Sequence, residues 1–222
     1  MNIELVLSAV GIPDNTVERW LILNHPARVR ANICVVTDSL TEYRNVRTVH
    51  VNPQDRFDIG KINNIGIRSS VADIVIKTDV DIVFSANIIE YVRLNVCPGA
   101  AVICKCRNID IDDLDTSEWD GTEIRHQGRG ACFAMHVNDW HKLKGYDERM
   151  RSYGGDDDGL FRRARDLCAV VQSSEYELYH VNHDPRISIG FPNCGKSNME
   201  IHEKLPTWHK LKEAEDWGLN HG

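Results

Sequence analysis

The sequence predicts an α/β fold, in which helices cover both faces of a mainly parallel sheet. Apolar runs typical of strands recur along the first half of the chain, with helix-like patterns between them. Two of these runs, IELVLSAV at residues 3–10 and ADIVIK at residues 72–77, lack a polar alternation, which favours parallel strands covered on both faces. A doubly wound sheet satisfies both observations, and its ligands should bind at the carboxyl ends of the strands.

The elements of the first half follow from the hydrophobic pattern and from residues that favour helix starts. Asn15, followed three residues later by Glu18, forms a capping box for the first helix. Asp58 and Ser85 are candidate N-caps for two further helices. The expected helices are residues 15–24, 59–70 and 86–95, and the expected strands are residues 3–10, 32–37, 48–51, 74–77 and 100–105.

The pattern changes after residue 107, where an acidic stretch rich in turn-forming residues predicts a loop or short strands. Regular structure then resumes, and the residues after 184, with several prolines and glycines, should form a flexible segment that ends in a helix. We find no internal repeat and no domain boundary. The expected elements are a strand over residues 131–137, helices over residues 138–143, 156–167 and 207–216, and short strands near Val170 and Leu178.

Length, composition and charge exclude several classes of protein. The 222 residues are 42% hydrophobic and 27% charged, which argues against a disordered, collagen-like or coiled-coil chain. A net charge of -7 gives no basic footprint for non-specific binding to nucleic acid or anionic lipid. The seven cysteines lack zinc-ribbon and disulfide-framework spacing, and we interpret them as reduced thiols. With neither a signal-peptide pattern nor a membrane span in the sequence, we expect a cytoplasmic protein.

Asp79 and Asp81 close an apolar strand, where buried carboxylates need a positive partner. Residues two apart in an extended chain face the same way, so both carboxylates should point into the crevice while Val80 packs behind them. Two hard oxygen ligands suit Mg²⁺ or Mn²⁺ that carries a diphosphate. Three other Asp-x-Asp triplets lie in acidic contexts, where a solvated role is the better interpretation.

A second candidate site begins at Tyr153 and continues through two glycines to Asp156, Asp157 and Asp158. An ordinary helix start is one interpretation, because acidic residues in a first turn complement the helix dipole. The double glycine favours a site, since it lets a ligand approach the backbone beside an acid that can act as general base toward a hydroxyl. Tyr153 offers a sugar ring an aromatic platform.

His180 and His183 follow a short predicted strand and are candidate ligands for the same cation, with a structural role as the open alternative. The segment GFPNCGKS at residues 190–197 satisfies the P-loop pattern GxxxxGK[ST]. A P-loop needs a preceding strand and further strands beyond its helix, and too few residues follow Ser197 for such a core. We therefore expect Lys196 to touch a phosphate from a loop. The GxGxxG pattern of dehydrogenases is absent.

Three blocks of the sequence follow one another in a specific order. The first is KINNIGIR at residues 61–68 with KTDVDIVF at residues 77–84; the second is GRGACFAMHVNDWHKLKGYDERMRSYGGDDDGLFRRARD at residues 128–166; the third is YHVNHDPR at residues 179–186. Together they resemble the nucleotide-sugar glycosyltransferases of the GT-A fold, particularly family 2 and the β-1,4-galactosyltransferase and chondroitin-polymerase groups. The resemblance covers nearly the whole chain and implies one Rossmann-like GT-A domain.

On the donor side, the resemblance implies that Asp38, which closes ICVVTD, contacts the nucleoside. The resemblance also places Asn64 and Arg68, in the first block, among the residues that bind the nucleotide sugar. Asp79 and Asp81 would flank the metal ion and the diphosphate. The donor is then a UDP-sugar or a similar nucleotide sugar, bound together with Mn²⁺ or Mg²⁺.

On the acceptor side, Asp157 falls where the family has its catalytic base, and Asp156 where it has an acid that orients the acceptor or donor sugar. His180 follows a tyrosine, as in the chondroitin-polymerase pattern, whereas His183 matches the galactosyltransferase spacing. We prefer His180 as metal ligand and keep both. By role the chain divides into a nucleotide-sugar-binding half at residues 1–107, an acceptor and catalytic half at residues 108–184, and a C-terminal segment at residues 185–222.

The resulting hypothesis is a metal-dependent, inverting glycosyltransferase that transfers a sugar from a nucleotide sugar to an acceptor hydroxyl. The acceptor is a glycan, a lipid, a protein or a modified nucleic acid. Two alternatives stay open: a catalytically inactive GT-A protein that binds glycan or nucleotide, and a P-loop phosphotransferase. Tyr153 and Gly159 depart from the family's aromatic and acidic residues, and so leave the identity of the acceptor open.

Overall fold

The structure is a computed structural model of the chain and has the α/β architecture that the sequence predicts. It describes residues 1–25, 30–52, 58–84, 87–109, 123–125, 130–150, 155–181 and 217–219. Within these ranges the strands join into one nine-stranded sheet.

The first half of the chain forms the parallel part of the sheet. Its elements are β1 (Ile3–Ser8), α1 (Asp14–Leu23), β2 (Asn32–Thr37), β3 (Arg47–His50), α3 (Ile59–Arg68) and β4 (Ile74–Thr78). The strands lie in the order β3-β2-β1-β4, each parallel to its neighbour. Their carboxyl ends therefore meet at one edge of the sheet, which is where an α/β fold binds its ligands.

The second half adds strands that run in both directions. Its elements are β5 (Ile82–Phe84), α4 (Ile88–Asn95), β6 (Ala100–Ile109), β7 (Glu123–Arg125), β8 (Cys132–His136), α5 (Val137–Leu143), α6 (Asp156–Leu167) and β9 (Ala169–Val181). β8 pairs antiparallel with β4 and with β6. β9 runs parallel to β6, and its end pairs antiparallel with β5.

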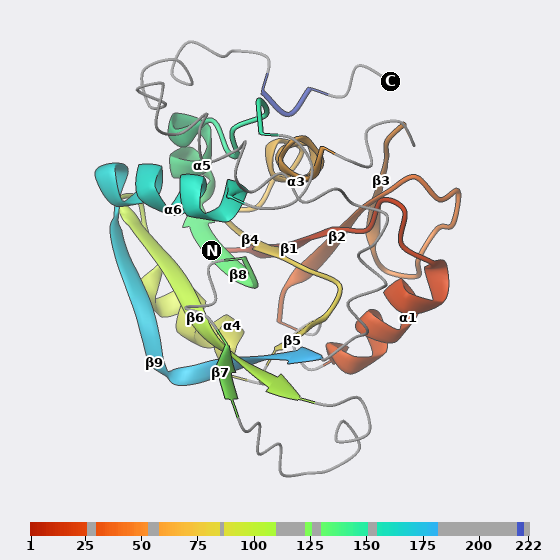
Figure 1. The fold of residues 1–222 in the computed structure, drawn as a ribbon, viewed down its shortest axis with the longest axis horizontal. Helices are drawn as coiled ribbons and strands as arrows, with labels where there is room; N and C mark the ends of the chain where they lie inside the picture. Colours follow the sequence, from red (N-terminus) through yellow and green to blue (C-terminus); the bar gives the residue numbers. More distant parts are fainter. Residues whose placement is uncertain are drawn as a thin grey trace.

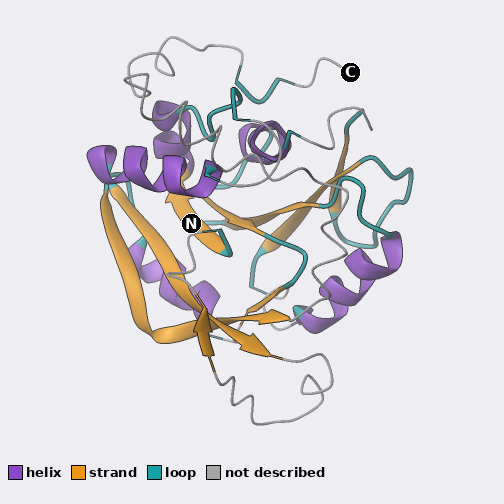
Figure 2. Ribbon diagram, in the orientation of Figure 1, coloured by secondary structure: helices purple, strands orange, loops and turns teal. Residues whose placement is uncertain are grey.

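Two apolar layers, one on each face of the sheet, confirm the doubly wound arrangement. Leu5 and Leu7 of β1 belong to the layer that contains Trp20 of α1, whereas Val6 belongs to the layer that contains Ile62 of α3. Because successive residues of a strand point to opposite faces, a strand that serves both layers must be apolar throughout. Figures 1 and 2 show α1 and α4 on one side of the sheet and α3, α5 and α6 on the other.

Helix α3 lies close against the parallel strands because it carries a glycine at the contact. A Cβ atom on Gly66 would lie 2.4 Å from a methyl carbon of Val6 and 2.7 Å from one of Val36. Real Cβ atoms do not approach so closely, so a side chain here would push α3 away from the sheet.

Helix starts differ from the expected caps. The capping box at Asn15 is wrong: α1 begins at Asp14, its N-cap is Pro13, and no side chain caps it. The Asp14 carboxylate instead accepts hydrogen bonds from Thr41 and Tyr43 at 2.6 and 2.8 Å. Asp58 is the N-cap residue of α3, although its side chain makes no capping hydrogen bond. The Asp14 carboxylate is committed to distant residues of the fold, which a local pattern does not reveal.

One strand differs from the prediction in length. The two short strands expected near Val170 and Leu178 are a single strand, β9, because its ladder with β6 continues past an irregularity between Ile103 and Lys105. The helix expected over residues 207–216 and the N-cap expected at Ser85 lie outside the described residues. None of the helices in the described ranges is both long and apolar enough to cross a membrane.

Candidate active site

The candidate site lies where β4, β8, β9 and α6 meet. Asp79 follows β4 directly, and Thr78 is paired with Cys132, so the residues just before β8 lie beside the end of β4. The end of β9 reaches the same edge through its pairing with β5, in which His180 lies opposite Ile82. The strand ladders therefore bring residues that are about 100 positions apart in the sequence to one place.

Lys77 is a buried cation at the centre of this site. Its side chain is 3% exposed. Its ammonium donates to the Gly130 carbonyl at 2.8 Å and pairs with Asp79 Oδ1 at 2.8 Å and with Asp157 Oδ1 at 3.8 Å. Burial alone would lower the pKa of Lys77, but the charge of Asp79, with Tyr146 and Asp157, outweighs it and holds the pKa well above its usual value. Lys77 is therefore charged.

Lys77 is not among the site residues predicted from the sequence. A signal was present, because this lysine is a cation inside an apolar run that ends at two aspartates. Isolated charges are rarely buried without a partner, so a lysine in such a strand indicates a carboxylate nearby in the fold.

Asp79 carries the carboxylate that pairs most closely with this ammonium. Its side chain is 40% exposed, so it faces solvent on one side and Lys77 on the other. Loss of water around the carboxylate, together with the charges of Asp81 and Asp157, raises the pKa of Asp79 to about 6, while Lys77 opposes the shift. Asp79 therefore has a protein cation as its neighbour before any ligand binds.

Asp81 and His180 form a second contact beside it. His180 Nε2 lies 3.2 Å from Asp81 Oδ2, and each side chain is 23% exposed. His180 Nδ1 lies 3.1 Å from Asn108 Oδ1. The amide oxygen of Asn108 accepts a hydrogen bond from the Nδ1–H group, which leaves Nε2 facing a carboxylate. The short distance between Nε2 and Asp81 Oδ2 is favourable if a proton lies between these two atoms or if both bind the same metal ion.

The donor atoms of this pair fit a divalent cation, because carboxylate oxygen and imidazole nitrogen are both ligands of Mn²⁺. The orienting hydrogen bond from the His180 ring to Asn108 is also typical of a metal-binding histidine. Among the described residues, no group of three or more histidine, cysteine and acidic side chains gathers in metal-binding geometry. His183 lies outside those residues, and metal binding by Asp79, Asp81, His180 and His183 stays a prediction.

The acidic block, Asp156 to Asp158, forms the first turn of α6, as the sequence predicts. Gly155, the N-cap residue, has φ of 86°, a left-handed conformation that favours glycine. Asp156 is buried, and its burial, with the charge of Asp157, raises its pKa to about 7. Tyr153 lies outside the described residues, so the proposed aromatic platform stays a prediction.

Asp157 is held from several sides. The Tyr146 hydroxyl donates to its Oδ1 at 3.1 Å. Burial raises the pKa of Tyr146, so the phenol keeps the proton that it donates. A Cβ atom on Gly130 would lie 2.5 Å from Asp157 Oδ2, so the carboxylate rests against the backbone of that turn. Asp157 is 32% exposed and therefore accessible to an acceptor.

Asn64 and Arg68, predicted to bind the nucleotide, lie against the protein itself. Asn64 is fully buried; its amide donates to the Tyr146 carbonyl at 2.9 Å and accepts from the Tyr146 backbone at 2.7 Å. Arg68 donates a hydrogen bond to the Trp217 carbonyl, and its guanidinium carbon lies 5.6 Å from the centre of the Trp217 ring. These contacts give both side chains a structural role; nucleotide binding by either stays a prediction.

Asp38 lies immediately after β2, at the edge where the parallel strands end. Its Oδ1 accepts a hydrogen bond from the backbone N–H of Gly11 at 2.8 Å, which joins the turns after β1 and β2. This position agrees with the expected nucleoside contact without testing it. Lys196 lies outside the described residues.

Comparison with known proteins adds a family model and a set of solved structures. The model described as the N-terminal domain of galactosyltransferase matches residues 117–184, which include Asp156, Asp157, His180 and His183. A comparison with curated protein sequences gives no match.

The similar solved structures share the fold at low sequence identity. GalNAc-T7 with UDP, GalNAc and Mn²⁺ has a TM-score of 0.59 and 13% identity, over 82% of this chain and 44% of its own. TarS of S. aureus with UDP-GlcNAc has a TM-score of 0.59 and 10% identity, over 83% of this chain and 59% of its own. This chain thus spans less than two thirds of both.

A third similar structure is the catalytic domain of Drosophila β1,4-galactosyltransferase 7 with xylobiose. It has a TM-score of 0.54 and 14% identity, over 84% of this chain and 73% of its own. A mutant of that enzyme has been solved with manganese, UDP-Gal and xylobiose. The chain therefore has the GT-A fold of the nucleotide-sugar glycosyltransferases, and the galactosyltransferase model matches the part of it that carries the acidic block.

Proposed function

We propose that this protein is a metal-dependent, inverting glycosyltransferase that transfers a sugar from a UDP-sugar to an acceptor hydroxyl. One observation carries the proposal. The first group, Asp79 and Asp81 after β4 with His180 near the end of β9, lies beside a second group, Asp156 and Asp157 in the first turn of α6. Lys77 lies between the two groups, within 2.8 Å of Asp79 and 3.8 Å of Asp157. A site with this division can bind a charged donor on one side and accept a proton on the other.

On the donor side, Asp81 and His180 would hold Mn²⁺ or Mg²⁺, with Asp79 and His183 as the further predicted ligands. Such a cation neutralises the charge that develops on a departing diphosphate. Three of the similar structures contain UDP or a UDP-sugar, and two of these also contain manganese, which supports this donor and this metal. Asp38, at the end of β2, would contact the nucleoside.

On the acceptor side, Asp157 would take the proton of the attacking hydroxyl. The hydroxyl oxygen forms a bond to C1 of the donor sugar, and the bond from C1 to the diphosphate oxygen breaks. The electron pair leaves with the diphosphate, the proton stays on Asp157, and attack from the opposite face inverts C1. Asp156, with a pKa of about 7, would hold a proton and orient a sugar hydroxyl.

A glycan hydroxyl is the acceptor that we propose first, because xylobiose is bound in the Drosophila enzyme. Lipid, protein and modified nucleic acid are the other classes to test. The cytoplasmic location rests on the cysteine pattern of the sequence and stays a prediction.

Calorimetric titration with UDP, in Mn²⁺ and again in EDTA, tests the donor side. We expect binding in Mn²⁺ and strongly weakened binding in EDTA, because the diphosphate would otherwise meet the carboxylates of Asp79 and Asp81. Equal affinity in both conditions would remove the metal from the proposal. A parallel assay of UDP release from UDP-sugars, with and without a glycan acceptor, tests turnover. Binding without any turnover would instead favour an inactive GT-A protein.

A further inference from the structure

Lys77 is a buried charge that the proposed reaction does not by itself use. It lies on β4 between Ile76 and Thr78, and its neighbours across the sheet are Val6 of β1 and Phe133 of β8. An apolar side chain would suit such a position. Replacing a buried ion pair by apolar residues is often neutral or stabilising, so stability alone does not account for a lysine here.

The partners of Lys77 come from four separate segments. Its ammonium is bonded to the Gly130 carbonyl, in the turn before β8, and to Asp79, after β4. It also lies 5.9 Å from the centre of the Tyr146 ring and 3.8 Å from Asp157, on α6. One ammonium thus connects the donor side of the site with the acceptor side.

The same partners enclose the Asp157 carboxylate. Oδ1 faces the Lys77 ammonium and the Tyr146 hydroxyl, and Oδ2 lies against Gly130, whose carbonyl is bonded to Lys77. Lys77 therefore acts on both oxygens: on Oδ1 through its charge, and on Oδ2 by fixing the turn that carries Gly130.

We propose that Lys77 is a positioning residue that fixes the Asp157 carboxylate in the orientation needed to receive the acceptor proton. The inference rests on the proposed function, in which Asp157 is the base. Without the ammonium, Asp157 would lose one of the two groups that hold Oδ1 within the described ranges, and the Gly130 carbonyl would lose its hydrogen bond to Lys77. A misplacement of about 1 Å in a reacting group can reduce turnover about 10²-fold.

A double-mutant cycle with Lys77→Met and Asp157→Asn tests this role. At saturating donor, we expect Lys77→Met to lose about 10²-fold in kcat. In the Asp157→Asn background, Lys77→Met should cost little more, because two residues that act as a unit are not additive. A general structural role predicts losses that multiply. Wild-type turnover in Lys77→Met, or multiplied losses in the double variant, would overturn the proposal.

Crystal structures of the wild type and of Lys77→Met give a readout that does not depend on activity. We expect the Asp157 carboxylate to move away from the Tyr146 hydroxyl in the variant; an unchanged carboxylate would contradict the inference. If the wild type transfers no sugar, the proposed function fails, and this comparison still decides whether Lys77 positions Asp157. Lys77→Gln, which can still donate to the Gly130 carbonyl, replaces Lys77→Met if the latter does not fold.

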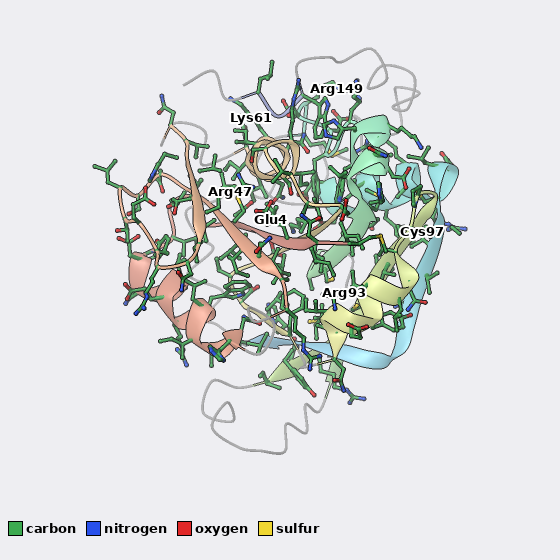
Figure 3. The ribbon with its side chains drawn as sticks, turned by 180° about the vertical axis from the view of Figure 1, so that it is seen from behind. Glu4, Arg47, Lys61, Arg93, Cys97 and Arg149 are labelled. Carbon is green, nitrogen blue, oxygen red and sulfur yellow. The ribbon has the colours of Figure 1, made fainter. Side chains whose placement is uncertain are left out.

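Glu4→Gln provides a matched control for the loss of a buried charge elsewhere in the sheet. Glu4 of β1 is buried and accepts two hydrogen bonds from Arg47 of β3, at 3.0 and 2.8 Å. Figure 3 shows this pair on the parallel strands. Glu4→Gln should lower the thermal unfolding temperature while leaving kcat unchanged. A kcat loss equal to that of Lys77→Met would show that any buried charge in the sheet has this effect.

Discussion

The two acidic groups of the candidate site are held by different kinds of backbone. Asp79 and Asp81 lie between β4 and β5, and the ladder to β9 fixes them, with the Val181 N–H donating to the Asp81 carbonyl at 2.8 Å. Asp156 and Asp157 lie on the first turn of α6, directly after its N-cap residue Gly155, which has a left-handed conformation. One group is therefore fixed by strand pairing and the other by a helix start.

The partners of the two groups differ as well. Asp79 faces the Lys77 ammonium at 2.8 Å and Asp81 faces the His180 imidazole at 3.2 Å, so each strand-end carboxylate has its own basic partner. At the helix start, Asp157 has a neutral hydroxyl and a more distant ammonium, and Asp156 has a pKa of about 7. The same residue type thus suits cation binding in one place and proton exchange in the other.

The largest effect that tests this division is expected from Asp157→Asn. The amide keeps the shape of the side chain but cannot accept the proton of the acceptor. Loss of a general base typically lowers the rate about 10² to 10⁴-fold. We expect a loss of this size in sugar transfer, with UDP and Mn²⁺ affinities near those of the wild type, measured by calorimetry and by product formation.

Asp158→Asn is the control for this variant, because the next helical position points about 100° away and should matter less to the chemistry. Normal transfer by Asp157→Asn together with inactive Asp156→Asn or Asp158→Asn would move the base by one residue. Normal transfer by all three variants would leave the acidic block as a helix start alone.

A smaller effect, confined to the strand-end group, is expected from Asn108→Ala. Asn108 orients the His180 ring through a 3.1 Å contact with Nδ1. Loss of such an outer partner typically weakens metal binding about 10 to 100-fold. We expect the Mn²⁺ concentration needed for UDP binding to rise by this factor, while kcat at saturating Mn²⁺ changes little. Asn95→Ala, which removes a hydrogen bond to Tyr91 within α4, should leave the required Mn²⁺ concentration unchanged. An unchanged Mn²⁺ requirement in Asn108→Ala would argue against His180 as a ligand.

Much of the fold was predictable because its signals are local. The apolar runs of β1 and β4 have to serve both faces of the sheet, and the acidic residues at 156–158 mark the first turn of α6 correctly. The position of Asp79 at the end of a central strand followed from the same pattern. These features depend on residues within one element or next to it.

The features that the sequence did not predict depend on distant contacts. Asn64 is bonded to Tyr146, and Arg68 to Trp217, across 82 and 149 positions of the chain. Lys77 stands out in the sequence as a cation inside an apolar run, but its partners Gly130, Tyr146 and Asp157 lie on other segments and could not be named from that run. The capping box expected at Asn15 is a further case: α1 begins one residue earlier, at Asp14, which is bonded to the distant Thr41 and Tyr43.

A further expected effect concerns stability rather than activity, and it depends on pH and on the proton of Asp156. An aspartate has a pKa of about 3.9 in an unfolded chain, and burial together with the charge of Asp157 raises that of folded Asp156 to about 7. Between these values the folded protein retains a proton that the unfolded chain has lost. The free energy of unfolding should therefore fall as pH rises from about 4 to 7, by at most about 1.4 kcal/mol per pH unit for this one group.

Asp156→Asn should flatten the dependence of the free energy of unfolding on pH. Urea unfolding in EDTA between pH 4 and 8 measures this slope, to which Asp79, with a pKa of about 6, continues to contribute.

Asp147→Asn provides a control of opposite sign. Although burial opposes it, the Arg149 guanidinium lowers the pKa of Asp147, so this carboxylate stabilises the fold at neutral pH and loses that effect as pH falls below about 4. Asp147→Asn should therefore reduce stability at pH 7 and leave the slope between pH 4 and 7 intact. Parallel profiles for Asp156→Asn and the wild type would mean that Asp156 does not retain a proton in the folded protein between pH 4 and 7, and so does not hold the proton that its proposed role at the helix start requires.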